Sequence, residues 1–242
     1  MRHIGIVGCS APGAALCHQT ICTEAAALMG QRYAHPEVSM HTHPLSEYMA
    51  CVETGDWDGV TELMLSSAEK LAKIGADFLI TPDNTIHQAL DLFRERSPLP
   101  WLHIAEEVAA EAKRLGCRRV ALLGTKFLME GPVYPAQFAK LGIEYRIPER
   151  SERELINGFI FDELTDGRIT TQAREYFKSV ILGLKKEGCD AVGMCCTEIP
   201  LLLRPGQDTE LPLLDSTRLL ARAALKKAIG PGVSGPKPCS PF

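Results

Sequence analysis

The sequence has no apolar run that approaches the ~20 residues needed to span a bilayer. The apolar stretch at its N-terminus, residues 4–8, is also too short for the core of a signal peptide. It is typical of a first buried strand instead. From these absences we expect a cytoplasmic protein with no membrane partner.

Positive charge is not in excess, and the motifs of common cofactor sites are missing. Lys and Arg number 26 against 30 Asp and Glu, for a formal charge of −4, whereas a nucleic-acid binder needs clustered basic residues. No GxGxxG or GxxxxGK(S/T) segment predicts a nucleotide site. His41 and His43 alternate along one predicted strand without a third metal ligand. We therefore predict no nucleic-acid partner, no cofactor and no metal.

The cysteines offer no zinc pattern either, although there are nine of them. No CxxC pair or Cys/His quartet is present, and an odd number in a reducing compartment favours free thiols over disulfides. Most should be small buried residues. The question is whether one of them stands out by its position.

What the sequence does have is the alternation of strand and helix patterns that is typical of an α/β protein with parallel sheets covered by helices. Predicted strands span residues 3–8, 36–42, 77–82, 100–104, 119–124, 143–147, 190–195 and 211–214, and predicted helices span 12–30, 57–75, 85–95, 105–116, 130–141, 151–165, 169–188 and 216–229.

An internal repeat divides this pattern in two. Three pairs of segments match in order at offsets of 112 to 116: residues 4–10 with 120–126, 73–85 with 186–198, and 99–103 with 211–215. We therefore predict two pseudo-symmetric half-domains, each a parallel sheet flanked by helices, with the active site in the cleft between them. The first comprises residues 1–103 plus 213–230 and the second residues 104–212, and 231–242 form a flexible tail rich in Gly, Pro and Ser.

Polar motifs follow the predicted strands, where parallel sheets bind ligands. Cys196 follows one strand and precedes a short predicted helix, whose N-terminus would lower the pKa of the thiol. Asp83 holds the matching position in the first half and would face Cys196 across one ligand. As a base it needs a raised pKa, which burial can supply; the simpler interpretation is that residues 83–85 cap the next helix.

Further donors surround these two positions. Those predicted to bind a substrate carboxylate are Ser10, Asn84, Thr85, Thr125 and Thr197. Three more residues would support the site: Cys9 beside Ser10, His87 one turn into its helix, where it could polarise the cleft, and Glu198, which could fix the turn or orient a partner.

The segments Asp83-Asn84-Thr85 and Cys195-Cys196-Thr197-Glu198 resemble the two motifs of the cofactor-independent aspartate/glutamate racemase family, Cys-Asn-Thr and Gly-Cys-Thr-Glu. The resemblance covers residues 1 to about 229, and segments 99–105, 120–125 and 147–157 look most like its bacterial branch that racemises L-aspartate and L-glutamate. It implies a homodimer without pyridoxal phosphate. Two bases would transfer the α-proton of aspartate or glutamate, Cys196 on one face and Asp83 on the other.

The sequence departs from the family pattern in three places. Asp83 replaces the first catalytic Cys, and Gly8-Cys9-Ser10 replaces consecutive glycines. Several racemases look to use a Lys near the region of Leu164, where this sequence has none. A related Cys-dependent decarboxylase or isomerase of small carboxylic acids, or a carboxylate-binding homologue with impaired catalysis, therefore stays open.

Overall fold

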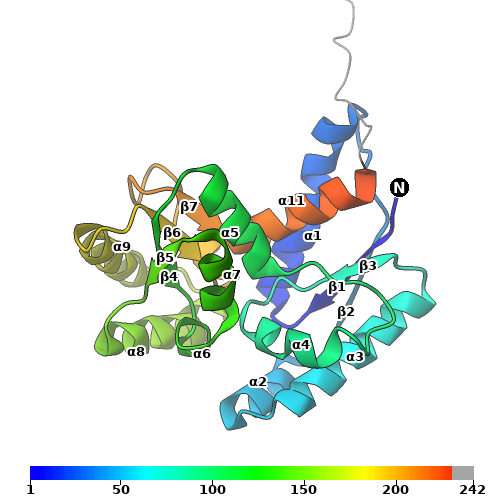
Figure 1. Cartoon of the computed structure of the whole chain (residues 1–242), viewed down its shortest axis with the longest axis horizontal. Helices are drawn as coiled ribbons and strands as arrows, with labels where there is room; N and C mark the ends of the chain where they lie inside the picture. The colour runs from blue at the N-terminus through cyan, green and yellow to red at the C-terminus, as the bar shows by residue number, and fades with distance from the viewer. Residues whose placement is uncertain (231–242) are drawn as a thin grey trace, which may run out of the picture.

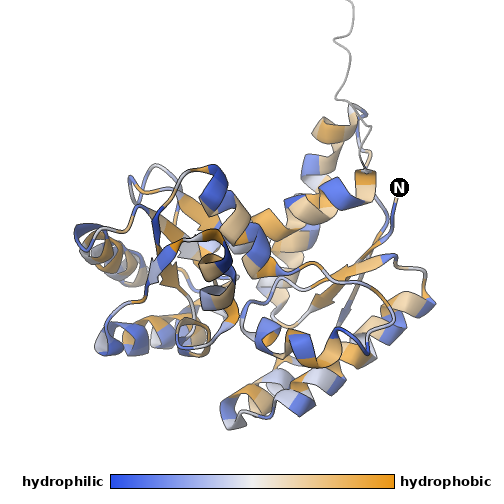
Figure 2. Ribbon diagram, viewed as in Figure 1, coloured by the Kyte–Doolittle hydropathy of each residue, from blue (hydrophilic) through white to orange (hydrophobic). Residues whose placement is uncertain are grey.

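The computed structural model describes residues 1–230, and the predicted tail at 231–242 lies outside them. Two separate parallel sheets lie side by side, each flanked by helices (Figure 1). Hydrophobic residues are concentrated on the strands and on the helix faces turned toward them (Figure 2). The predicted α/β class with two sheets is confirmed.

The first sheet has the order β2-β1-β3. Its strands are β1 (Ile4–Gly8), β2 (Val38–Thr42) and β3 (Phe78–Ile80), and β1 is buried along its whole length. The strand predicted at 100–104 shrinks to one bridge between Leu79 and Trp101. The reason is that His103 already caps the next helix, accepting a hydrogen bond from the amide of Ala105.

The second sheet has the order β5-β4-β6-β7. Its strands are β4 (Arg119–Leu123), β5 (Glu144–Arg146), β6 (Ala191–Met194) and β7 (Leu213–Asp215). Both sheets therefore place their first strand in the middle, the second strand on one side and the third on the other. The bridge at Trp101 takes the place in the first sheet that β7 takes in the second.

Helices cover the sheets and make the connections that parallel strands require. They are α1 (Ala11–Met29), α2 (Leu45–Thr54), α3 (Trp57–Lys73), α4 (Leu90–Phe93), α5 (Ile104–Arg114), α6 (Lys126–Met129), α7 (Val133–Leu141), α8 (Arg150–Phe159), α9 (Thr171–Lys186), α10 (Ile199–Leu202) and α11 (Ser216–Ile229). A 3-10 helix, η1 (Thr85–Ala89), precedes α4, and a π-helical turn, η2 (Ile160–Leu164), continues α8.

The chain exchanges its helices between the two sheets. Helix α5 packs its apolar face on β4 in the second half, whereas α11 returns and packs against α1 and β1 in the first. The division into half-domains follows this exchange, and we keep it as an interpretation with one correction. Strand β7 is hydrogen-bonded to β6, so residues 213–215 lie with the second sheet and the return to the first half begins at α11.

Two helices were missing from the predicted pattern, the four-residue α6 and the longer α2. Helix α2 carries Leu45, Tyr48, Met49 and Val52, an i, i+3, i+4, i+7 spacing that indicates one apolar helix face. The sequence therefore held the signal for α2. This face covers the candidate site.

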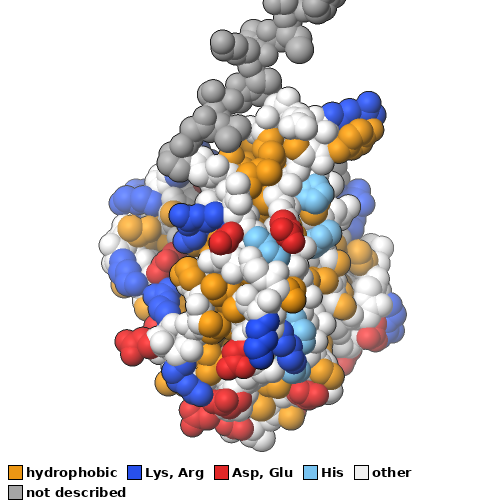
Figure 3. All heavy atoms as spheres, turned by 90° about the vertical axis from the view of Figure 1, so that its right-hand side faces the viewer, with side chains coloured by type: hydrophobic (Ala, Val, Ile, Leu, Met, Phe, Trp, Pro, Cys, Tyr) orange, Lys and Arg blue, Asp and Glu red, His pale blue; other side chains and the backbone are white. Residues whose placement is uncertain are grey.

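No described helix is both long enough and apolar enough to cross a membrane. Figure 3 shows the outer face of the first half, where acidic and basic side chains are interspersed with histidines and hydrophobic groups.

Candidate active site

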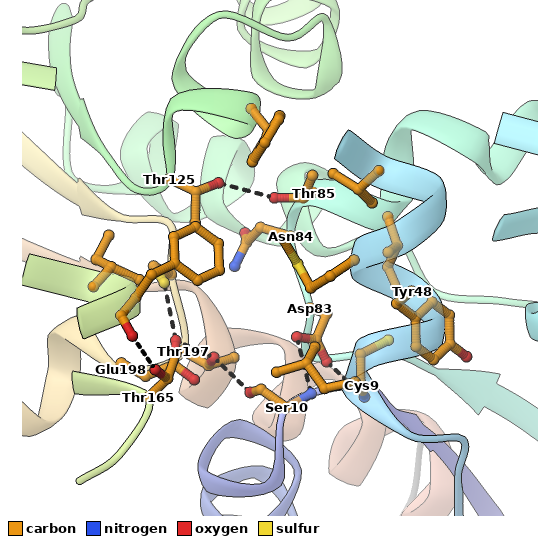
Figure 4. Close-up of a pocket in the computed structure, with 18 of the residues that line it drawn as sticks. Cys9, Ser10, Tyr48, Asp83, Asn84, Thr85, Thr125, Thr165, Thr197 and Glu198 are labelled. Carbon is orange, nitrogen blue, oxygen red and sulfur yellow. Dashed lines mark hydrogen bonds between the residues drawn. The ribbon is translucent and has the colours of Figure 1, made fainter. Parts of the chain in front are cut away.

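A cavity with an empty volume of about 610 Å³, its mouth included, opens between the carboxyl ends of the two sheets. Every predicted site residue except His87 lines it: Cys9, Ser10, Asp83, Asn84, Thr85, Thr125, Cys196, Thr197 and Glu198. Figure 4 labels all of these residues except Cys196 and shows that they converge from both halves of the molecule.

Asp83 is half-buried at the end of the segment that follows β3. Its carboxylate accepts hydrogen bonds from the backbone amides of Cys9 (3.0 Å) and Ser10 (3.4 Å), 74 and 73 residues away in the chain. The alternative that the Asp83 side chain caps its own helix is wrong, because η1 begins after Asn84 without a side-chain cap.

The pKa of Asp83 is raised from 3.8 to about 7, mainly by burial and then by the nearby charge of Glu198; the two amide hydrogen bonds oppose this rise. A carboxyl group with a pKa near neutrality can both accept and donate a proton at physiological pH. Asp83 therefore has the raised pKa that a role as a base requires.

The prediction that Cys196 is an activated thiolate is wrong. Its pKa is raised well above the ordinary value, first by burial and then by the charge of Glu198. The thiol donates a hydrogen bond to Glu198 Oε2 (2.9 Å), so the side chain is poised as an acid. Helix α10 begins only at Ile199 and has four residues, too few to offset the loss of solvation.

Glu198 ends a chain of hydrogen bonds from the opposite half-domain. Thr197 Oγ1 donates to Glu198 Oε2 (2.7 Å), which uses the only hydroxyl hydrogen of Thr197. In the contact between Ser10 Oγ and Thr197 Oγ1 (3.0 Å), Ser10 is therefore the donor. Glu198 Oε2 thus accepts from a hydroxyl and a thiol, while the buried Oε1 has no partner among the described residues.

Two threonines meet across the cavity. The Oγ1 atoms of Thr85 and Thr125 lie 3.2 Å apart, one from each half-domain (Figure 4). Thr125 Oγ1 also accepts from the amide of Leu128 and so caps α6. Since the two hydroxyls share one hydrogen bond, one hydroxyl hydrogen remains free to donate to a ligand.

Asn84 is more occupied than the sequence predicted. Its Oδ1 accepts from the hydroxyl of Tyr134 (2.6 Å), and its Nδ2 donates to Ser216 Oγ (3.0 Å). All three side chains are buried. Asn84 therefore joins the two halves, and one amide hydrogen is left for a ligand.

His87 does not line the cavity, so the prediction that it polarises the cleft is wrong. Its Nδ1 lies 2.9 Å from the carbonyl oxygen of Asp83, and its Nε2 accepts from the amide of Ile104. This pattern requires the neutral ring with the proton on Nδ1. Burial and the neighbouring His103 lower the pKa of His87 to about 3. His87 thus fixes the backbone of Asp83 against the start of α5.

Cys9 lies beside Asp83 in the cavity wall and is buried. Burial, followed by the charge of Asp83, raises its pKa well above the ordinary value. It is thus a neutral thiol like Cys196. The eight cysteines in the described part of the chain are all free.

The described residues contain no group of three or more His, Cys, Asp or Glu side chains that could hold a metal ion. His41 Nδ1 lies 3.0 Å from Ser67 Oγ, and His43 Nε2 lies 3.2 Å from Ser66 Oγ. Both rings therefore bind neighbouring hydroxyls on α3.

Sequence reasoning missed the apolar part of the cavity. Helix α2 contributes the face described above, and further apolar side chains come from Phe127, Ile160 and Phe161. The π-helical turn that carries Ile160 and Phe161 is a rare element that is frequent at functional sites. Of these apolar elements, only α2 could have been recognised from the sequence, by the i, i+3, i+4 spacing of its apolar residues.

Comparison with known proteins agrees with this architecture. The profile of the family described as Asp/Glu/Hydantoin racemase matches residues 5–224. A crystal structure from Yersinia pestis, provisionally described as an Asp/Glu racemase, superposes with a TM-score of 0.85 at 30% identity and covers 95% of this chain and 100% of that one. An aspartate racemase homologue from Pyrococcus horikoshii OT3 gives a TM-score of 0.80 at 27% identity, with the same coverage.

A curated relative is RacX of Bacillus subtilis (strain 168), named a broad specificity amino-acid racemase. It is 24% identical over 170 residues, which cover 70% of this chain and 73% of that protein. Because the family profile spans nearly all the described residues and the fold matches over 95% of the chain, the protein belongs to the Asp/Glu/hydantoin racemase family.

Proposed function

We propose that this protein is a cofactor-independent amino-acid racemase in which Asp83 and Cys196 exchange the α-proton on opposite faces of the substrate. The observation that carries the proposal is that these two groups, one from each half-domain, line a single cavity in complementary protonation states. Asp83 titrates at a pKa of about 7, and Cys196 is a neutral thiol.

In one direction the Asp83 carboxylate removes the α-proton, and the electron pair left on carbon delocalises into the substrate carboxylate. The Cys196 thiol then donates its proton to the opposite face and becomes a thiolate. In the other direction the thiolate removes the proton and Asp83 returns one. Glu198, hydrogen-bonded to the thiol, is placed to exchange a proton with the sulfur between turnovers.

The enediolate-like intermediate needs donors at its oxygens. The free hydroxyl hydrogen of the Thr85–Thr125 pair and the remaining amide hydrogen of Asn84 are the candidates from side chains. Preorganised donors that meet developing charge contribute about 3–4 kcal/mol each. Asp83 and Cys196 differ in basicity, so the individual proton-transfer steps differ in rate constant, but the ratio of kcat/KM between the two directions is fixed by the equilibrium between enantiomers.

The test is α-proton exchange in deuterated water, followed by NMR, together with chiral chromatography. The panel contains aspartate and glutamate, the substrates that the family resemblance implies, and neutral amino acids. We expect exchange with inversion, abolished by Cys196→Ala and retained by Cys189→Ala, a buried cysteine outside the cavity lining.

Three other outcomes separate the alternatives. Exchange without inversion would mean that Asp83 does not act as the second group. Release of CO₂ or isomerisation of a double bond would favour a decarboxylase or cis–trans isomerase. Binding without exchange of any substrate would favour a homologue with impaired catalysis. The homodimer implied by the resemblance is checked separately by light scattering.

A further inference from the structure

The charged side chains that line the cavity are all acidic. Its lining contains two carboxyl groups, Asp83 and Glu198, but no Lys, Arg or His among the described residues. The electrostatic influences on Asp83 and Cys196 that shift their pKa values likewise come from acidic neighbours. A ligand carboxylate that enters here without a partner would be desolvated beside like charge, which is unfavourable.

The acidic side of the cavity still has acceptor capacity. Glu198 is 2% exposed, and its Oε1 is buried without a hydrogen-bond partner. A buried unpaired carboxylate oxygen is costly, so a donor from a ligand would be favourable there. Among small metabolite groups, an ammonium supplies both the donor and the opposite charge.

The lining also has an apolar part, to which α2 contributes one wall. Three side chains come from α2 and three from the segments after β4 and α8: Leu45, Met49, Val52, Phe127, Ile160 and Phe161. Such a surface binds an aliphatic or thioether side chain by excluding water from both.

Two basic groups lie near the cavity without lining it. Lys126 is exposed, with its ammonium 5.1 Å from the centre of the Phe127 ring. His43 lines a neighbouring pocket at the mouth and is 3.9 Å from Glu47 Oε2. Lys126 stands between two lining residues in the chain, Thr125 and Phe127, so its substitution tests whether it contacts a second carboxylate.

We propose that the substrate is an α-amino acid with an uncharged, apolar side chain of about the size of leucine or methionine, bound with its ammonium toward the Asp83–Glu198 side and its side chain against the α2 wall. This inference rests on the proposed racemase function and narrows its substrate class, away from the dicarboxylic amino acids that the family resemblance implies.

The experiment measures binding and exchange separately. Calorimetric titration of the Cys196→Ala protein compares L-leucine, L-aspartate, L-glutamate and 5-isobutylhydantoin, which carries the leucine side chain without ammonium or carboxylate. We expect leucine to bind at least tenfold more tightly than the other three. In the wild type, kcat/KM for exchange should follow the same order.

One variant tests where the substrate side chain lies. Met49→Lys puts an ammonium into the α2 wall at nearly constant side-chain length, and we expect it to shift the leucine-to-aspartate ratio of binding constants at least tenfold toward aspartate. An unchanged ratio would overturn the placement of the side chain against α2. Circular dichroism and thermal unfolding check that the variant is folded.

The remaining outcomes are decisive as well. Aspartate or glutamate bound as tightly as leucine would overturn the inference, and Lys126→Met would then show whether Lys126 supplies the missing charge. Binding of the hydantoin in preference to leucine would overturn the ammonium contact. Tight leucine binding without exchange in the wild type would refute the proposed racemase function while leaving the substrate class intact.

Discussion

Replacing Asp83 with Asn should change how stability depends on pH. The carboxyl group has a pKa of about 7 in the folded protein against an ordinary value of 3.8. Below about pH 4 the carboxyl group is neutral in both the folded and unfolded states, so its ionisation does not affect the free energy of unfolding. Between pH 4 and 7 only the unfolded state loses its proton, so the free energy of unfolding falls as pH rises.

The size of this fall follows from the shift. About three pH units at 1.36 kcal/mol per unit give about 4 kcal/mol as an upper value, and screening of the half-buried side chain reduces it to about 2–4 kcal/mol. Asp83→Asn removes this slope. The variant also loses one of the two acceptors for the amides of Cys9 and Ser10, which costs about 1–3 kcal/mol at every pH.

The two effects predict that the free energies of unfolding of the wild type and Asp83→Asn approach each other as pH rises. The variant should be less stable than the wild type at pH 4.5 and should equal or exceed it at pH 8. Urea unfolding at four pH values between these limits measures the difference, in which other titrating groups cancel. Asp77→Asn, which removes an acceptor from the amide of His3, controls for the lost hydrogen bond outside the cavity.

Parallel curves for the wild type and Asp83→Asn between pH 4.5 and 8 would refute the reasoning. They would mean that the Asp83 carboxyl is solvated and ionised like an ordinary aspartate. The argument for Asp83 as an acid/base near neutral pH would then fail with it.

Two further substitutions test the framework of the site. A Cβ at Gly13 would overlap the side chain of Thr197, so Gly13→Ala should lower the free energy of unfolding by about 1–3 kcal/mol and reduce α-proton exchange. Gly183 in α9 has open space around it, so Gly183→Ala should raise the free energy of unfolding by about 0.5–1 kcal/mol. Tyr134→Phe leaves Asn84 Oδ1 without its donor and should cost about 1–3 kcal/mol, measured by thermal or urea unfolding.

Local sequence patterns determined the strands, most helices and the repeat. Buried parallel strands are short apolar runs, and the polar residues that follow them lie at one edge of the sheet whatever their partners are. For this reason the lining of the cavity by Asp83, Thr125 and Cys196 was predictable from their positions after strands. The spacing within α2 carried the same kind of information.

Only the tertiary structure decided what these side chains do. Asp83 turns to amides 73 and 74 residues away, the Cys196 thiol donates to Glu198 instead of ionising, and His87 bonds to backbone outside the cavity. Each outcome depends on side-chain direction and on solvent exclusion between segments distant in the chain, which no local pattern encodes. The lack of a cation in the cavity lining, among residues 1–230, has the same cause: lysines and arginines are plentiful in the sequence, and only folding decides which side chains reach the cavity.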